Sequence, residues 1–187
     1  MKKRSILLFR GLPGSGKTTA ADMMQSIIGG ARINADQIRS SISNDLKFTD
    51  DDRLVQAYRL GAITGVAIKD PLAYPQEVYA DRGHLNTTAI VDFVCPTEST
   101  LDAFCQMAYW HAVPTISITV ILMDTITPDQ CRFPDTAKLF EPLTRNKVLV
   151  TRWETPDQLR TKMTELARHL GYLEGGKQHP EKSIITV

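Results

Sequence analysis

A glycine-rich stretch near the N-terminus has the residue types and spacing of a phosphate-binding loop. It reads Gly11-Leu12-Pro13-Gly14-Ser15-Gly16-Lys17-Thr18-Thr19. Glycine allows successive N–H groups to point at phosphate oxygens, a lysine supplies a cation for the β- and γ-phosphates, and the hydroxyl after it can hold Mg²⁺. The stretch therefore predicts ATP and Mg²⁺ as cofactors. We expect Lys17 to be catalytic and to lie in a solvent-facing loop, with Thr18 as a metal ligand.

The elements around this stretch place it at the edge of a parallel sheet. Apolar residues 6–9 predict a buried strand before it, residues 18–28 a helix after it, and residues 31–34 a second strand. In such a βαβ unit, ligands bind at the carboxyl ends of the strands. Later patterns predict strands at 88–94, 116–123 and 147–150 and helices at 50–68, 98–109 and 156–170. The predicted fold is therefore an α/β, three-layer P-loop NTPase fold, with a mostly parallel central sheet flanked by helices.

Charged residues follow or lie in the predicted strands, where such a sheet binds its ligands. Asp36 could organise Mg²⁺ or accept a hydroxyl proton, and Arg39, one helical turn later, could reach an anion. The alternative is structural, with Asp36 as a helix N-cap and Arg39 solvated, and the residues alone leave both open. Asp92, in the third strand, is a weaker candidate for the acidic residue that assists Mg²⁺. Arg53 points to a partly buried side of its helix, where an unpaired cation is costly.

The composition favours one domain with a small phosphorylated partner. The chain has 187 residues, 42% of them hydrophobic, and a formal net charge of +1. This is enough for one α/β core, and the charge provides no field that would select nucleic acid or an anionic membrane. The three cysteines lack metal or disulfide spacing, and no run could span a membrane. We therefore expect a cytoplasmic protein with reduced thiols, and the sequence is compatible with a homodimer.

The chain divides into a predicted kinase domain over residues 1–172 and a polar tail over residues 173–187, which we expect to be frayed. Within the domain, residues 125–146 contain three prolines and show no clear period. A segment of this length without a regular pattern favours a mobile lid.

The order of motifs resembles that of the adenylylsulfate (APS) kinase family, P-loop enzymes that phosphorylate the 3′-hydroxyl of adenosine 5′-phosphosulfate (APS) to give PAPS in sulfate assimilation. After its phosphate loop, that family has D-G-D-N-x-R, then L-x-x-D-L-G-F-S-x-E-D-R, then a strand ending in I-S-P. The corresponding segments here are NADQIR at 34–39, ISNDLKFTDDDR at 42–53 and Val94-Cys95-Pro96. The resemblance spans roughly the first 100 residues and keeps the spacing between the motifs.

The resemblance implies roles for the matching residues. Asp36 would act as general base or Mg²⁺ organiser near the 3′-hydroxyl of APS. Arg39 and Arg53 would hold the phosphosulfate, and Phe48 would stack on the substrate adenine. Arg132, at the start of the lid, resembles the family arginine that packs over the ATP base. Paired arginines suit a doubly anionic group and an aromatic face suits a purine, so these roles agree with the residue chemistry.

Further substrate contacts are expected where the sequence departs from the family. Gln56 replaces a family asparagine, and Val94-Cys95-Pro96 replaces the I-S-P strand end. The lid sequence also differs, so Phe140 or Phe133 becomes the candidate for the second half of the adenine clamp. Residues 69–88 resemble an insertion.

Two other departures leave more than one function open. Asn34 and Tyr58 stand where the family has an aspartate and an arginine. APS kinase is the favoured function. The alternatives are a P-loop kinase for another nucleotide, a nucleoside or a nucleic-acid end, and a non-catalytic module that binds ATP or APS.

Overall fold

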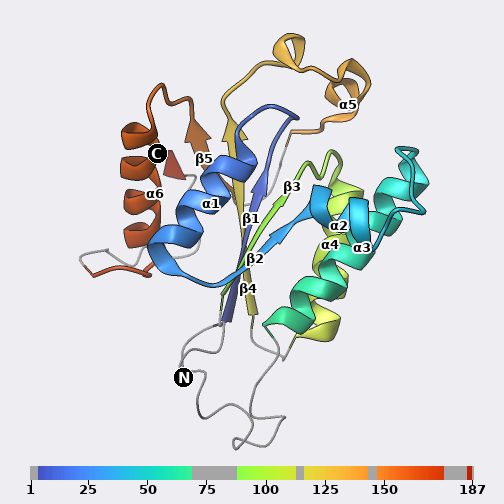
Figure 1. The fold of residues 1–187 in the computed structure, drawn as a ribbon, viewed down its shortest axis with the longest axis horizontal. Coiled ribbons are helices and arrows are strands. Elements are labelled where there is room, and N and C mark those ends of the chain that lie inside the picture. The colour runs from blue at the N-terminus through green and yellow to red at the C-terminus, as the bar shows by residue number, and fades with distance from the viewer. Residues whose placement is uncertain (1–3, 69–87, 113–115, 143–146, 175–184, 187) are drawn as a thin grey trace, which may run out of the picture.

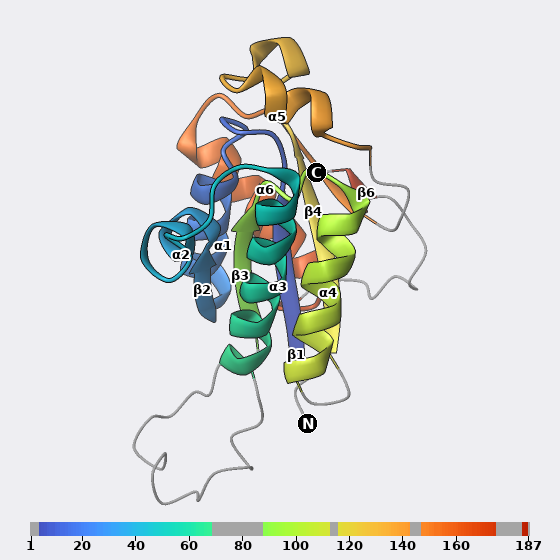
Figure 2. The same cartoon turned by 90° about the vertical axis from the view of Figure 1, so that its right-hand side faces the viewer.

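The protein is a parallel sheet between two layers of helices (Figures 1 and 2). The computed structural model describes residues 4–68, 88–112, 116–142, 147–174 and 185–186. Its six strands have the order β2-β3-β1-β4-β5-β6, and every neighbouring pair is parallel. The predicted α/β fold of a P-loop protein is confirmed.

The elements follow the predicted order, with a few additions. The strands are β1 (Arg4–Arg10), β2 (Ala31–Asn34), β3 (Thr88–Phe93), β4 (Ile116–Asp124), β5 (Lys147–Thr151) and β6 (Ile185–Thr186). The helices are α1 (Lys17–Ile28), α2 (Ala35–Ser41), α3 (Asp50–Ala67), α4 (Glu98–His111), the short 3₁₀ helix η3 (Pro128–Gln130), α5 (Pro134–Leu139) and α6 (Pro156–His169). In the described part of the chain, no helix combines the length and the apolar character that crossing a membrane requires.

One expectation about the chain changes, and another concerns residues outside the described part. We expect a frayed tail from the sequence, but strand β6 in the tail pairs with β5, so the tail is not frayed throughout. The predicted insertion over residues 69–88 lies outside the described residues, apart from Thr88, which begins β3.

The middle of β1, residues 6–9, is apolar because both faces of the strand are covered. Ile6 and Leu8 pack in the core shared with α3 and α4, whereas Leu7 and Phe9 pack in the core shared with α1 and α6. All four side chains are at most 1% exposed. Figure 2 shows α3 and α4 side by side over their face of the sheet. The phosphate loop therefore follows a strand in the interior of the sheet, between β3 and β4.

Side-chain caps fix where the helices near the sheet edge begin. Thr49, Thr97 and Thr155 cap α3, α4 and α6. The cap of α2 is Asn34, whose side chain accepts a hydrogen bond from Gln37 N at 2.8 Å. The alternative role of Asp36 as an N-cap is therefore wrong, and its carboxylate lies in the first turn of α2.

Candidate active site

The phosphate loop lies between the end of β1 and the start of α1. Gly14 and Gly16 have φ angles of 91° and 78°, in the left-handed region that glycine adopts without strain. The N–H of Ser15 donates to the carbonyl of Leu12 at 3.1 Å, which closes the turn before α1. A helix N-terminus reached by such a turn presents unpaired N–H groups to an anion.

Lys17 is buried, which corrects our expectation of a solvent-facing side chain. It is 9% exposed, and its Nζ donates to the carbonyl of Leu12 at 2.8 Å. Burial lowers the pKa of Lys17, and the charges of Asp36 and Asp92 raise it in opposition. Because these carboxylates come from α2 and β3, Lys17 is the point where the loop meets both neighbouring elements.

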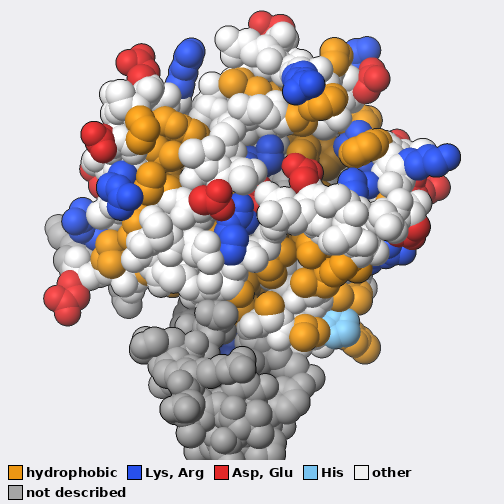
Figure 3. Space-filling model, in the orientation of Figure 1, with side chains coloured by type: hydrophobic (Ala, Val, Ile, Leu, Met, Phe, Trp, Pro, Cys, Tyr) orange, Lys and Arg blue, Asp and Glu red, His pale blue; other side chains and the backbone are white. Residues whose placement is uncertain are grey.

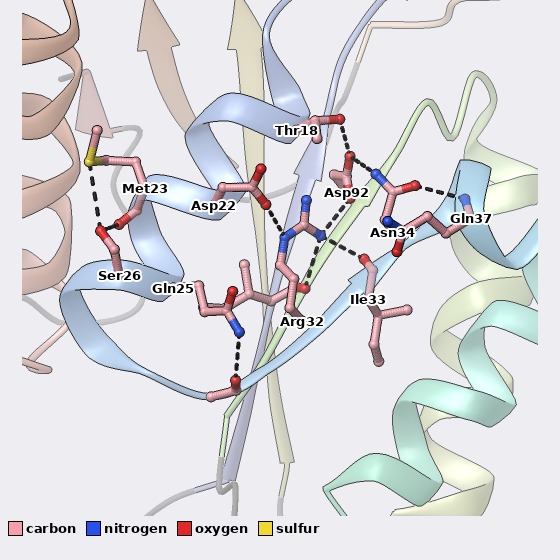
Figure 4. Close-up of polar contacts among 12 residues, drawn as sticks. Thr18, Asp22, Met23, Gln25, Ser26, Arg32, Ile33, Asn34, Gln37 and Asp92 are labelled. Carbon is pink, nitrogen blue, oxygen red and sulfur yellow. Dashed lines mark hydrogen bonds and ion pairs between the residues drawn. The ribbon is translucent and has the colours of Figure 1, made fainter.

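Asp92 on β3 is the carboxylate that contacts the loop hydroxyl (Figure 4). Thr18 Oγ1 donates to Asp92 Oδ2 at 2.5 Å, and Asn34 Nδ2 donates to the same oxygen at 2.9 Å. Asn34 and Asp92 are register partners on adjacent strands. Asp92, the weaker candidate in the sequence, thus contacts the phosphate loop directly. The resemblance leads one to expect an aspartate at position 34, on the neighbouring strand.

The chemistry of these groups fits a magnesium ion. Mg²⁺ takes oxygen ligands and is commonly held by one or two carboxylates together with substrate phosphates. The Thr18 hydroxyl donates its hydrogen bond to Asp92, which leaves the lone pairs of its oxygen for a cation. Asp36 lines the same hollow as Lys17 and Asp92. Thr18 and these two carboxylates are therefore the residues that could hold the metal.

A hollow beside the loop collects most of the residues expected to bind the acceptor. Elements α2, α3, the segment between them and the end of β3 all contribute to it. Of the expected residues it is lined by Asp36, Arg39, Phe48, Arg53, Gln56, Val94 and Pro96, together with Lys17. The structure therefore brings these expected residues together around one hollow.

Two arginines flank an exposed aromatic ring in this hollow. Phe48 is 70% exposed, and the Cζ atoms of Arg39 and Arg53 lie 4.8 and 5.9 Å from its ring centroid. Burial lowers the pKa of Arg39, the positive charge of Arg53 lowers it further, and Asp36 opposes both. Two guanidinium groups that repel each other beside a flat apolar face suit a ligand that is anionic and carries a ring.

Gln56 contributes an unpaired acceptor to the same hollow. The side chain is fully buried, and Nε2 donates to the carbonyl of Ala35 at 3.2 Å. Within the described residues Oε1 has no hydrogen-bond partner. Buried polar atoms are nearly always paired, so this oxygen is suited to a ligand hydroxyl or amine.

The strand end after β3 enters the site only in part. Cys95 does not line the hollow, because its side chain is fully buried in the core beneath α3 and α4. Its φ angle is 46°, and its carbonyl accepts a hydrogen bond from Arg10 Nε at 2.6 Å. Burial raises the pKa of the Cys95 thiol to about 12, so the thiol stays protonated. Of Val94-Cys95-Pro96, the structure thus brings Val94 and Pro96 to the expected site.

The lid residues occupy different places. Arg132 and Phe133 are exposed and stack on each other, with the Cζ of Arg132 at 5.7 Å from the ring centroid. Phe140 covers the buried Arg10 at 4.4 Å and does not line the hollow. Arg53 Nη2 donates to Thr136 Oγ1 at 3.2 Å, so the segment that carries α5 contacts a residue that lines the hollow. The closing motion of this segment stays a prediction.

A second hollow lies on another side of the phosphate loop, and the sequence analysis did not predict it. It has a volume of about 210 Å³ and is lined by Gly14, Ser15, Gly16, Thr125, Ile126, Arg152 and Trp153. The ring of Trp153 packs on Gly16, where a Cβ atom would lie 2.6 Å from it. A single tryptophan in a connection after a strand shows no period or motif, so only the fold reveals that it adjoins the phosphate loop.

Among the described residues on the face seen in Figure 3, no extended patch of one charge is visible. Basic and acidic side chains are interspersed there with hydrophobic ones. This agrees with the net charge of +1. Charge that could select an anion is therefore local, as at Arg39 and Arg53.

The N-terminal part of the chain is similar to one known protein family. The adenylylsulphate kinase family model matches residues 3–72, which include the phosphate loop, Asp36, both arginines and Phe48. No curated protein matches the sequence significantly.

Solved structures share the fold at low sequence identity. APS kinase CysC of Mycobacterium tuberculosis, in complex with AMPPNP and APS, matches with a TM-score of 0.61 and 19% identity, over 88% of this chain and 97% of that chain. A sugar kinase from Janibacter sp. matches with a TM-score of 0.58 and 17% identity, over 95% and 99%. A gluconokinase from Sinorhizobium meliloti matches with a TM-score of 0.53 and 14% identity, over 91% and 97%.

These neighbours act on different acceptors, so their likeness establishes the fold rather than the substrate. The family match adds what the fold alone does not, because it covers the phosphate loop and the residues that α2, α3 and the segment between them contribute to the hollow. The match of residues 3–72 to the adenylylsulphate kinase family model and the fold together support a P-loop kinase, that is, an ATP-dependent phosphotransferase that acts on a hydroxyl group.

Proposed function

We propose that this kinase transfers the γ-phosphoryl group of Mg-ATP to the 3′-hydroxyl of adenosine 5′-phosphosulfate. The observation that carries the proposal is the pair Arg39 and Arg53 on the exposed ring of Phe48. A nucleotide that ends in a phosphosulfate supplies both partners, since its purine can stack on the ring and its anionic end can accept from the guanidinium groups. A neutral acceptor would offer the two guanidinium groups no anionic partner.

The phosphate loop and the acceptor hollow divide the chemistry between them. Lys17 supplies a positive charge where negative charge develops on the transferred group. Asp36 accepts the proton of the acceptor hydroxyl or organises the metal beside it, as the sequence suggested. When bound, Mg²⁺ neutralises charge on the phosphates, and Thr18 with the neighbouring carboxylates is the set that would hold it.

The donor base belongs in the hollow beside Trp153. That hollow adjoins Gly14 to Gly16 and is separate from the lining of the acceptor site. Its walls include the Trp153 ring and Ile126, and aromatic and aliphatic walls suit a purine. Arg132 keeps its proposed role over the same base if the lid closes. For the second half of the clamp on the acceptor adenine, Phe133 rather than Phe140 has an exposed ring.

The catalytic reading is preferred to a binding module for one structural reason. Asn34 lacks a carboxylate, but Asp92 supplies one at the adjacent register position and contacts Thr18. The loss of an aspartate at position 34 therefore does not leave the phosphate loop without an acidic partner.

Acceptor specificity is tested by a turnover panel. The purified protein is incubated with Mg-ATP and, in turn, APS, AMP, adenosine, gluconate and a 5′-hydroxyl oligonucleotide, and ADP release is followed. We expect APS to give the highest kcat/KM, and Lys17→Met to abolish turnover. Higher turnover of gluconate or of adenosine would contradict the proposed acceptor, and ATP hydrolysis that no acceptor stimulates would contradict a kinase role.

A further inference from the structure

Arg32 is a charged residue on β2 whose guanidinium joins three elements behind the phosphate loop (Figure 4). Its side chain is 13% exposed. Nε donates to Asp22 Oδ1 on α1 at 2.8 Å, and Nη1 donates to Asp92 Oδ1 on β3 at 2.6 Å. Nη1 also lies 2.9 Å from the carbonyl of Ile33. Arg32 therefore links the first helix to two adjacent strands.

The consequence for Asp92 is that both of its oxygens are engaged. Oδ1 accepts from Arg32, while Oδ2 accepts from Thr18 and Asn34. Its side chain is 4% exposed, so solvent contributes little to its orientation. A nearly buried carboxylate is costly unless it is paired and hydrogen-bonded. Among the residues that the structure describes, Arg32 is the only partner of this carboxylate in an ion pair, and it fixes the rotation of the group.

The contacts close a ring around the start of α1. Thr18 and Asp22 are four residues apart on α1 and therefore lie on one face, one turn apart. Thr18 reaches Asp92, Asp92 reaches Arg32, and Arg32 returns to Asp22. The first turn of α1 is thus held against the ends of β2 and β3 from two sides.

We propose that Arg32 is a positioning residue for the phosphate loop. By fixing Asp92, it keeps the Thr18 hydroxyl in the orientation that donates a hydrogen bond to the carboxylate. The lone pairs of the Thr18 oxygen then stay available to the Mg²⁺ that accompanies the nucleotide. Partners at this distance from a metal ligand typically change metal affinity by about 10- to 100-fold when they are replaced. The inference rests on the proposed binding of Mg-ATP and does not depend on the identity of the acceptor.

The test measures how much Mg²⁺ strengthens nucleotide binding. Calorimetry gives the Kd of AMPPNP in excess Mg²⁺ and in EDTA, and the ratio of the two constants reports the metal contribution without turnover. We expect Arg32→Met to reduce this ratio about tenfold while the Kd in EDTA changes little. The matched control is Arg59→Met, because Arg59 forms a similar ion pair with Asp45 at 2.6 Å on the surface. It should leave the ratio unchanged.

Other results would overturn the inference. An unchanged ratio in Arg32→Met, or an equal loss of affinity in both buffers, would show that Arg32 supports only the fold. If Arg32→Met does not fold, Arg32→Lys keeps one charge but cannot bridge two carboxylates as the guanidinium does. A ratio equal to that of the unchanged protein in Arg32→Lys would then contradict the proposal. An unchanged protein that binds no AMPPNP in either buffer would overturn the proposed function itself.

Discussion

Replacing either arginine beside Phe48 should weaken acceptor binding without changing ATP binding. Arg39 Nη1 donates to the carbonyl of Lys47 at 2.6 Å, and Arg53 Nε donates to the carbonyl of Phe48 at 3.0 Å. A guanidinium has five N–H donors, so each arginine keeps donors for a ligand after these contacts. Hydrogen bonds to charged groups contribute about 1.5–3 kcal/mol. Arg39→Gln and Arg53→Gln should therefore each weaken APS binding by about 10- to 150-fold.

The assay is calorimetric binding of APS, adenosine and AMPPNP to each variant. Adenosine can stack on Phe48 but carries no anion, so its affinity should change much less than that of APS. Arg59→Gln is the matched control, since Arg59 lies on α3 with Arg53 but pairs with Asp45 and does not line the hollow. Its APS affinity should stay within about twofold, because exposed ion pairs contribute about 0–1 kcal/mol.

A double variant extends the test. If both arginines bind the same anionic group, the loss in Arg39→Gln/Arg53→Gln should differ from the sum of the single losses by about 0.5–3 kcal/mol. Unchanged APS affinity in the single variants, or equal losses of APS and AMPPNP, would refute the assignment of these arginines to the acceptor. An equal loss for adenosine and APS would mean that they support the ring site rather than the anion.

Three further predictions concern other parts of the site. Asp36→Asn should lower kcat by about 10²- to 10⁴-fold with little change in the Kd of AMPPNP, and an unchanged kcat would remove Asp36 from the chemistry. In Trp110→Phe, Trp153 is the one remaining tryptophan, and its fluorescence should change when AMPPNP binds, whereas Trp153→Phe should give no such signal. The Cys95 thiol has a pKa raised from 9.0 to about 12 by burial, so its contribution to the free energy of unfolding is fully present below about pH 9 and is lost as pH rises towards 12. The free energy of unfolding, measured with denaturant from pH 8 to 11, should therefore fall more steeply in the unchanged protein than in Cys95→Ala. Parallel curves of this free energy against pH would contradict the burial argument.

Local patterns were enough to predict the fold and much of the site. The apolar run before Gly11, the capping threonines and the β-branched strand at 116–124 each specify an element through contacts close in sequence. Asp36, Arg39, Phe48 and Arg53 were placed together correctly because they lie on consecutive elements at one sheet edge.

What the sequence could not give depends on neighbours that are distant in the chain. That Asp92, rather than a carboxylate at position 34, contacts Thr18 follows from the register of β2 against β3. The direction of the Cys95 side chain depends on a backbone with φ of 46°, which no residue type signals at that position. Trp153 becomes relevant only because β5 ends beside the phosphate loop, and the burial of Lys17 follows from how α2 and β3 close around it.

The most direct test of the central claim is to identify the product formed from ATP and APS. Phosphorus NMR follows a reaction that contains the protein, Mg-ATP and APS, with 3′-deoxy-APS in a parallel sample. We expect ADP and a new phosphomonoester coupled to the ribose 3′-proton, with the phosphosulfate intact, and no such product from the 3′-deoxy compound. ADP with inorganic phosphate alone, or phosphorylation that persists with 3′-deoxy-APS, would contradict the account.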